Sequence, residues 1–531
     1  MSHRIYPLSE SAATVEWGDR MDDALHQQVL RLDLALRQQP FVGWVENVPA
    51  YASLTVFYRP ELLVEHSDLS PFLSVKKVLE ARLLALPEAL PVARKVVSVP
   101  VCYDEPFGPD LELVAMQNGL SPEQVITLHQ QKQYQVYMMG FLPGFAYMGI
   151  LDESIAAPRK ETPRPKVAAG SVGIAGRQTG IYPQDAPGGW QIIGRTPLRL
   201  FDPEKTDPFL FRTGDQVRFH AITPGEFHQL QQQAAEKPRN TPNPTLPAHA
   251  EVLKPGLFTT LQDQGRPGFR AFGVPSGGAM DRHAHDLANA LVDNFPEAAT
   301  LECTMGGLVL QFHTTARLAI TGAGEAFVNG QRIAMYQPCT VAEQDVLEIR
   351  FNRHGLRTYL AVQGGFTAPT LMHSKSMSPT IGIGAPLKKG DGLWFDRQVA
   401  DQPPVRPEVQ PPDWSGAIRV FPGPEYNWLT LESRERLFTQ PFTLSQRSDR
   451  MGCHLQAEPL HFIQPRELLS TAVTAGTIQC TPGGQLILLM QDCQTTGGYP
   501  RVGQIAAVDL PKVAQWIPGE RRSFVLEGAK S

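Results

Sequence analysis

The sequence lacks the segments that direct a chain into or across a membrane. Its first residues, MSHRIYPLSESAATVEWGD, contain no apolar run of the signal-peptide type. No stretch of about 18 uncharged apolar residues occurs anywhere in the chain. We therefore predict a cytoplasmic protein that has no membrane partner.

Several common catalytic signatures are also missing. The sequence has no G-x-x-x-x-G-K-[ST] phosphate loop, no H-E-x-x-H pair and no G-x-S-x-G elbow. It has no lysine flanked by methionines of the kind that carries biotin. Any biotin that takes part must therefore be carried on another chain.

Cysteine is scarce and scattered. None of the six cysteines forms a C-x-x-C pair, and no histidine cluster with ligand spacing accompanies them. We predict buried, reduced thiols, and the sequence assigns no metal site. The cysteines are Cys102, Cys303, Cys339, Cys453, Cys480 and Cys493.

Size and charge set further limits. A chain of 531 residues is too long for a single core. Its net charge of -5 argues against a nucleic-acid partner but leaves room for a local anion site. A small-molecule substrate and a homo-oligomer are expected.

Composition and periodicity divide the chain into five segments. We expect a small α+β domain (1–88), a β domain (89–236), a Pro- and Asn-rich linker (237–250), and two further β lobes (251–402 and 403–531). Strands are predicted at 13–16 and 52–58, and helices at 21–37, 70–84, 121–131 and 226–237. Another helix is expected to start at Asp281 as its N-cap.

A first glycine-rich block spans residues 143–197 and is rich in cations. Arginine forks and glycine N–H groups both bind carboxylate or phosphate, so the block favours an anion or ATP site. Surface charges on β-turns are the alternative, and Trp190 could equally be a pocket wall or a core residue. The candidates are Arg159, Arg164, Lys166, Gly170, Ser171, Gly188, Gly189, Trp190 and Arg195.

A second glycine-rich block spans residues 476–503. Polar residues follow the apolar strand 486–490, where they are well placed to bind a small polar ligand such as an amide or lactam. An ordinary hairpin turn is the alternative. The candidates are Asp492, Gln494, Thr495, Thr496, Gly497, Gly498, Tyr499 and Arg501.

A third polar cluster lies between these two blocks. It comprises the segments 262–266 and 276–281, which include Arg266 and Ser276, and its candidate site residues are Gln262, Asp263, Gly277 and Gly278. Glu302 is expected to face the same cleft. His283 and His285 have polar helical neighbours, so we interpret both as exposed helix residues rather than ligands.

Long motifs in both halves resemble one known family. PGFAYMG, AGSVGIAG and YPQDAPGGWQIIGRTP resemble allophanate hydrolase subunit 1, also known as the B-type subunit of 5-oxoprolinase or as kinase inhibitor. GLFTTLQDQGRPGF, GVPSGGAMD, SDRMG and QTTGGYP resemble allophanate hydrolase subunit 2, also known as the C-type subunit of 5-oxoprolinase or as biotin-dependent carboxyltransferase-like. The chain resembles a natural fusion of the two.

The resemblance implies a mainly β fold, with cyclophilin-like β-barrel domains and a small α+β domain at the N-terminus. It also implies ATP-dependent opening of 5-oxo-L-proline to L-glutamate, with Mg²⁺ and a separate TIM-barrel-like A-type subunit of 5-oxoprolinase. Carboxyl transfer to a urea-like amide and non-catalytic inhibition of a histidine kinase are the alternatives.

The residues depart from the family pattern at three places. Arg501 stands where lysine is common, Cys453-His454 replaces an aromatic–arginine pair, and Ala168 replaces a proline. Arginine does not act as a neutral base, so Arg501 is expected to act as an anion clamp.

The hypothesis that follows is activation of the lactam by phosphorylation of its oxygen. The first block would hold phosphates or the substrate carboxylate. Asp492 or Glu302 would handle protons or Mg²⁺, and Gln494, Thr495 and Tyr499 would orient the lactam.

Overall fold

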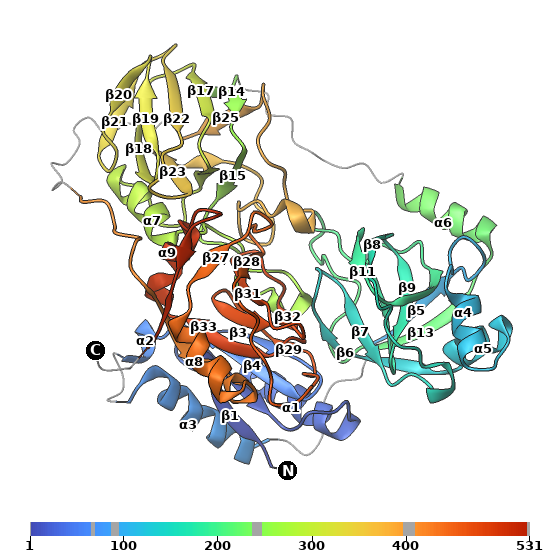
Figure 1. Cartoon of the computed structure of the whole chain (residues 1–531). Coiled ribbons are helices and arrows are strands. Elements are labelled where there is room, and N and C mark those ends of the chain that lie inside the picture. Colours follow the sequence, from blue (N-terminus) through green and yellow to red (C-terminus); the bar gives the residue numbers. More distant parts are fainter. Residues whose placement is uncertain (1, 65–68, 87–94, 236–246, 397–408, 528–531) are drawn as a thin grey trace.

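The computed structural model describes residues 2–64, 69–86, 95–235, 247–396 and 409–527. These residues form four consecutive strand-rich units (Figure 1). The prediction of a mainly β protein with barrel-like sheets and a small α+β unit is confirmed. Most of the predicted linker (237–246) and the predicted boundary at 402/403 lie outside the described residues.

The first unit is a four-stranded antiparallel sheet that carries helices on one face. Ser70 caps the helix 71–84 through the N–H of Leu73, and Pro71 occupies its first turn, as the sequence predicts. The sheet order is β1-β2-β4-β3. The elements are β1(Arg4–Ser9), β2(Ala12–Glu16), α1(Asp23–Gln38), β3(Trp44–Pro49), β4(Ser53–Tyr58), α2(Glu61–Val64) and α3(Pro71–Leu84).

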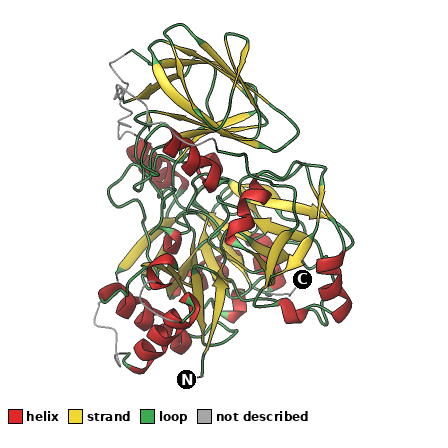
Figure 2. Ribbon diagram, turned by 90° about the vertical axis from the view of Figure 1, so that its left-hand side faces the viewer, coloured by secondary structure: helices red, strands yellow, loops and turns green. Residues whose placement is uncertain are grey.

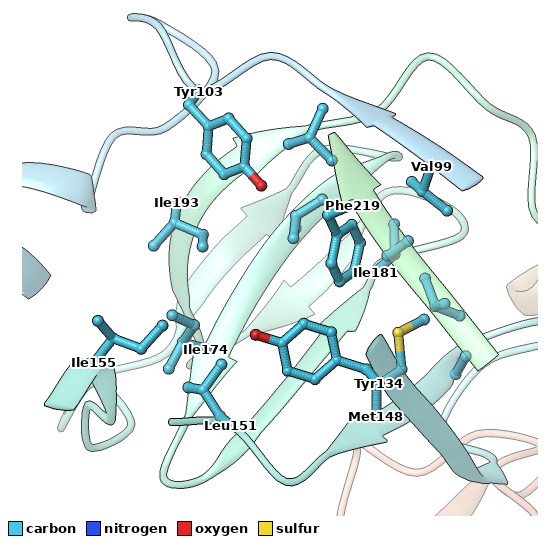
Figure 3. Close-up of a cluster of buried hydrophobic side chains, with 14 of the residues drawn as sticks. Val99, Tyr103, Tyr134, Met148, Leu151, Ile155, Ile174, Ile181, Ile193 and Phe219 are labelled. Atoms are coloured by element: carbon cyan, nitrogen blue, oxygen red, sulfur yellow. The ribbon is translucent and has the colours of Figure 1, made fainter. Parts of the chain in front are cut away.

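The second unit is a seven-stranded sheet curled into a nearly closed barrel. An antiparallel bridge from Cys102 to Arg195 connects its two outer strands, and aliphatic and aromatic side chains fill the interior (Figure 3). Its sheet order is β12-β9-β10-β7-β6-β13-β5. The elements are β5(Val96–Val101), α4(Leu111–Gln117), α5(Pro122–Gln131), β6(Gln133–Met139), β7(Ala146–Gly149), η1(Glu153–Ile155), β8(Arg164–Val167), β9(Ser171–Ala175), β10(Gln178–Ile181), β11(Ala186–Gly188), β12(Gln191–Arg195), β13(Gln216–Ala221) and α6(Pro224–Ala235).

The third unit packs a seven-stranded sheet against a five-stranded sheet, with an apolar core between them. Its helix is α7(Arg282–Leu291), which Asp281 caps as predicted. The other elements are β14(Ala250–Pro255), β15(Phe258–Gln262), η2(Arg270–Phe272), β16(Thr300–Thr304), β17(Leu308–Phe312), β18(Ala316–Gly322), β19(Glu325–Val328), β20(Gln331–Ile333), β21(Pro338–Val341), β22(Val346–Arg350), β23(Arg357–Val362), β24(Phe366–Thr367), η3(Pro379–Ile381) and β25(Gly392–Phe395).

The prediction of two exposed histidines on this helix is half wrong. His283 is exposed, but His285 is fully buried. Its Nδ1 lies 2.8 Å from Thr300 Oγ1 and its Nε2 lies 3.0 Å from the Pro296 carbonyl oxygen. His285 therefore faces the sheet and ties the helix to the start of β16.

The fourth unit is an eight-stranded sheet that lies beside the N-terminal unit (Figure 1). A two-stranded ribbon, β29 with β32, contacts β3 and β4 of the first unit. In Figure 2 the strands of the third unit stand apart at the top of the molecule, and those of the other units lie below them. The elements are β26(Ile418–Pro422), η4(Tyr426–Trp428), α8(Leu431–Thr439), β27(Phe442–Leu444), β28(Gly452–Gln456), β29(Thr471–Ala472), β30(Thr477–Cys480), β31(Leu486–Leu489), β32(Thr496–Gly497), β33(Arg501–Ile505), η5(Ala507–Asp509), α9(Leu510–Ala514), β34(Arg521–Arg522) and β35(Phe524–Leu526).

The thiol prediction is confirmed for five of the six cysteines. All six are free, and only Cys339 is half-buried rather than buried. Among the described residues, no helix has the length and the apolar character needed to cross a bilayer.

Candidate functional site

Loops from three parts of the chain meet at one place, which we call the junction: residues 140–145, 270–278 and 491–498. The Gly144 N–H donates to the Phe272 carbonyl (2.9 Å), and the Gly277 N–H donates to the Gln491 carbonyl (3.2 Å). A methyl group on Gly140 would overlap the hydroxyl of Thr496. The loop that leads into the first block therefore touches both polar regions of the second half.

A buried arginine holds two predicted carboxylates together at the junction. Arg450 Nε donates to Asp492 Oδ2 (2.8 Å), and its Nη1 donates to Glu302. Arg450 Nη2 also donates to the Gly278 carbonyl (2.7 Å). We call Glu302, Asp492 and Arg450 the carboxylate–arginine cluster. Its side chains are only 1–5% exposed, so each charge depends on the others.

This pairing limits what Glu302 can do chemically. Burial by itself raises the pKa of Glu302, but Arg450, Arg357 and two hydrogen-bond donors outweigh it and bring the pKa below its usual range. Glu302 therefore stays ionised near neutral pH and is poorly suited to donate a proton. Within the described part of the chain, no three His, Cys, Asp or Glu side chains are grouped to hold a metal.

The third cluster builds the wall around this arginine. Asp263 accepts hydrogen bonds from the hydroxyls of Ser374 and Ser376, each at 2.6 Å, and from two backbone N–H groups. Gln262 Oε1 lies 3.3 Å from Arg450 Nη2. The sequence analysis grouped Gln262 and Asp263 with Glu302 but missed Ser374 and Ser376. These serines lie 111 and 113 residues from Asp263 in the sequence.

The small size of Gly277 is needed here. A side chain at Gly277 would press on Arg266 and Ser378 and come within 3.6 Å of Asp492, and its φ of +62° also favours glycine. Arg266 is buried and donates to Ser378 Oγ (3.3 Å). The sequence analysis included Arg266 in the third polar cluster and Arg450 in the SDRMG motif, but it assigned a role to neither.

Three hydroxyls at the junction, those of Ser276, Thr495 and Thr496, have no hydrogen-bond partner among the described residues. The side-chain oxygens of Thr495 and Thr496 are buried and unpaired among the described residues. Gln494 makes one long contact, 3.4 Å from Gln479, and Tyr499 is 43% exposed. Buried hydroxyls normally have partners, so the two threonines are suited to accept a small polar ligand.

Arg501 lies apart from the carboxylate–arginine cluster. Its fully buried guanidinium donates to Glu425 through Nε (2.8 Å) and Nη2 (2.9 Å), and to the hydroxyl of Tyr6 (3.0 Å). Another donor reaches the Ala472 carbonyl (3.2 Å). Because protein acceptors take up this guanidinium, the geometry favours a role in joining β1, β29 and β33 over an anion clamp.

The structure does not gather the cations of the first block into a cradle. Arg164 pairs with Asp110 (2.7 Å), and Lys166 pairs with Asp185 (2.8 Å). Arg195 Nε donates to the Ala169 carbonyl (2.7 Å). Arg159 is exposed and forms no ion pair with any described carboxylate.

The remaining candidates of the first block are mostly structural. Trp190 is 5% exposed and packs against Phe145 and Tyr147, which favours the core interpretation. Ser171 is buried in β9, and the Gly170 N–H donates to the Tyr182 carbonyl (2.7 Å). Gly188 and Gly189 lie at the end of β11, where the hydroxyl of Tyr182 leaves no space for a side chain on Gly188.

Comparison with known proteins separates the chain into two matched parts. Residues 3–211 match the family model "Carboxyltransferase domain, subdomain C and D", and residues 272–526 match "Carboxyltransferase domain, subdomain A and B". The first part is 46% identical to the B-type subunit of 5-oxoprolinase from Bacillus subtilis over 235 residues, which are 44% of this chain and 98% of that protein.

The second part is 38% identical to the C-type subunit of 5-oxoprolinase from Escherichia coli over 280 residues, which are 52% of this chain and 90% of that protein. The crystal structure of TTHA0988 matches 97% of this chain and 99% of its own, with 32% identity and a TM-score of 0.83. Each half thus matches a relative over nearly its full length, and one solved structure matches both halves. The chain therefore belongs to the family of the B- and C-type subunits of 5-oxoprolinase, the allophanate hydrolase subunit 1 and 2 family, with both types on one polypeptide.

Proposed function

We propose that the chain is a component of ATP-dependent 5-oxoprolinase. It binds 5-oxo-L-proline and activates the lactam for ring opening to L-glutamate, together with a separate A-type subunit. The observation that carries this proposal is the match of its two halves to the B- and C-type subunits of 5-oxoprolinase.

The junction is our candidate for the lactam site. A lactam offers one N–H donor and one carbonyl acceptor, and a threonine hydroxyl supplies either partner. Thr495 and Thr496 are two of the three buried hydroxyls at the junction that lack partners among the described residues, and Ser276 is the third. A ligand there would contact both halves, since Thr496 lies against Gly140 of the first half.

The carboxylate–arginine cluster has a positioning role in this proposal. Arg450 holds Asp492, which closely precedes the threonines, and Gly278 of the neighbouring loop. A rigid support of this kind fixes the geometry of a binding loop.

ATP and Mg²⁺ fit the candidate residues of this chain poorly. The cations Arg164 and Lys166 are paired with aspartates, and the carboxylates Glu302 and Asp492 are paired with Arg450. ATP would supply a phosphoryl group to the lactam oxygen. No step through ATP follows from these residues, and the role proposed for the chain is to bind and orient the lactam.

The decisive experiment mixes the purified chain, a homologue of the A-type subunit, Mg-ATP and 5-oxo-L-proline, with glutamate and ADP as readouts. We expect both products only in the complete mixture. If a verified active A-type partner yields no glutamate above the no-substrate control, the proposal is overturned.

Variants test the junction within the same assay. We expect T495V and T496V to lower kcat/KM about tenfold or more, because each replaces a hydroxyl with a methyl group of the same shape. T481V is the matched control, since Thr481 lies in the turn between β30 and β31. Equal activity of all three variants would contradict a role for Thr495 and Thr496 in substrate binding.

Biotin-dependent carboxyl transfer to a urea-like amide is the second candidate. The matched family models, both described as carboxyltransferase domains, favour it. Adding a biotin carboxylase, its carrier and labelled bicarbonate separates the two functions, because only this candidate incorporates the label.

A further inference from the structure

A second cavity lies between the N-terminal unit and the last unit, behind the ribbon that carries Thr496. It has a volume of about 310 Å³, at the small end of ligand sites. Residues 18–19 and 52–53 line it from one side, and Trp428 and residues 466–471 line it from the other. The hydroxyls of Ser53 and Thr471 meet at 3.0 Å across this boundary.

One cationic side chain of this cavity, Arg466, is available to a ligand. The guanidinium of Arg466 lies over the Trp428 ring, with its carbon 4.5 Å from the ring centre. Its ion-pair contact is a single one of 3.6 Å to Asp19, which is 82% exposed. Cation–π stacking holds the guanidinium flat, so its edge remains available for a carboxylate.

The carboxylate of the next residue, Glu467, is also available to a ligand. Glu467 lines the same cavity, is exposed, and has no hydrogen-bond or ion-pair partner among the described residues. The cavity is therefore lined by an available positive group and an available negative group on consecutive residues, which matches a ligand with both charges. By contrast, Arg4 is already committed to Glu16 through Nε (2.8 Å) and Nη2 (3.0 Å).

The cavity is physically connected to the second glycine-rich block. A side chain on Gly498 would lie 3.4 Å from both the Leu468 carbonyl and Ser470 Oγ, which belong to the cavity wall. On the other side, Tyr6 donates to Glu16 (2.9 Å) and accepts from Arg501 (3.0 Å). An occupant of the cavity would thus contact Leu468 and Ser470, which in turn lie against Gly498 in the segment that follows Thr495 and Thr496.

We propose that this cavity binds a free α-amino acid, with the carboxylate on Arg466 and the ammonium on Glu467. L-Glutamate is the amino acid we assign to it, and this choice rests on the proposed function, of which it is the product. The chemistry discriminates against 5-oxo-L-proline, whose lactam nitrogen carries no positive charge. Binding of the product in this cavity would affect the second glycine-rich block, which lies against the cavity wall.

Titration calorimetry on the full chain, with neither ATP nor a partner protein present, tests the site directly. We expect the full chain to bind L-glutamate saturably. The T495V/T496V variant, in which the proposed substrate site is changed, should bind 5-oxo-L-proline more weakly than it binds L-glutamate. R466Q and E467Q should each weaken L-glutamate binding by about tenfold or more, since each removes a charge-assisted contact.

R353Q is the matched control, because Arg353 is an exposed arginine outside the cavity. It should leave L-glutamate binding unchanged. No L-glutamate binding at millimolar concentration, binding unaffected by R466Q, or equal affinity of T495V/T496V for 5-oxo-L-proline and L-glutamate would each overturn the proposal. Because the assay measures binding alone, failure of the oxoprolinase assay would not alter its result.

Discussion

Arg450 is the residue on which the carboxylate–arginine cluster depends. Two buried carboxylates lie against it, and both would lose their closest positive partner if it were removed. Breaking a buried pair on one side is far more costly than removing an exposed pair.

We therefore expect R450M to destabilise the second half by about 3–5 kcal/mol. Adding E302Q and D492N should recover part of the loss, because the buried negative charges are then gone. Chemical denaturation followed by tryptophan fluorescence measures both effects. R447M at the nearby exposed Arg447 is the control, and an equal loss in that variant would contradict the argument.

Asp509 predicts a specific acid sensitivity. Burial raises the pKa of its carboxyl, but hydrogen bonds from Arg419 and Lys512 outweigh burial and lower it from 3.8 to about 2. A carboxyl whose pKa is lower in the folded state than in the unfolded state stabilises the fold at pH values above its unfolded-state pKa. That contribution is lost as the pH falls from 3.8 to about 2.

D509N should therefore flatten the pH dependence of the thermal midpoint in this acid range while lowering the midpoint at neutral pH. D396N changes an exposed carboxyl and should keep the wild-type profile. Parallel profiles for the wild type and D509N between pH 3.8 and about 2 would show that Asp509 carries no such linkage.

Only part of the site was predictable at the residue scale. Helix caps such as Ser70 and Asp281 depend on neighbours within a turn, so local pattern is sufficient to predict them. Arg450 interacts with Glu302 at a separation of 148 residues, so the SDRMG motif that contains it predicts neither its burial nor its partner. His285 was misjudged for the same reason, since its partners lie beyond the helix.

At the scale of elements, β1 is joined to β33 through one hydroxyl. Burial raises the pKa of Tyr6 to about 12, so the phenol stays protonated and donates to Glu16 while it accepts from Arg501. The link connects the first strand of the chain with the strand that begins at the end of the second glycine-rich block.

Y6F should cost about 1.5–3 kcal/mol, because the lost hydrogen bonds involve charged groups. Y58F is a matched control, since the Tyr58 hydroxyl is buried and has no hydrogen-bond partner among the described residues. We expect Y58F to be neutral or stabilising in thermal unfolding. A larger loss in Y58F than in Y6F would contradict this account.

The elements that the sequence analysis missed share a physical cause. Helix α4 is only seven residues long, and α8 is rich in charge, with Ser433 and Leu437 as its buried residues. Such helices form because other elements pack on them, which periodicity does not report. The long helices α1 and α3 were predicted because each carries its own buried face and cap.

At the scale of the whole molecule, the two halves are held together by specific contacts. The Arg270 N–H donates to Glu46 Oε2 (2.9 Å), and the Arg270 guanidinium pairs with the same carboxylate. The Tyr6–Arg501 and Ser53–Thr471 contacts also cross from the first half to the second.

We therefore expect residues 1–235 and 247–531, expressed as separate chains, to co-elute as a one-to-one complex in size-exclusion chromatography. E46A should weaken that complex, because it leaves Arg270 without its partner at the boundary. E61A, which changes an exposed glutamate on α2, should not. Halves that elute separately at micromolar concentration would contradict the prediction.

The contact of Gly140 with Thr496 has a consequence for how this polypeptide behaves on dilution. The loop before the first glycine-rich block meets the second block only when both halves are docked, and here one backbone tethers them. Tethering replaces a bimolecular encounter with an effective concentration that does not change with the amount of protein. The fraction of molecules with a complete junction should thus be the same at nanomolar as at micromolar protein.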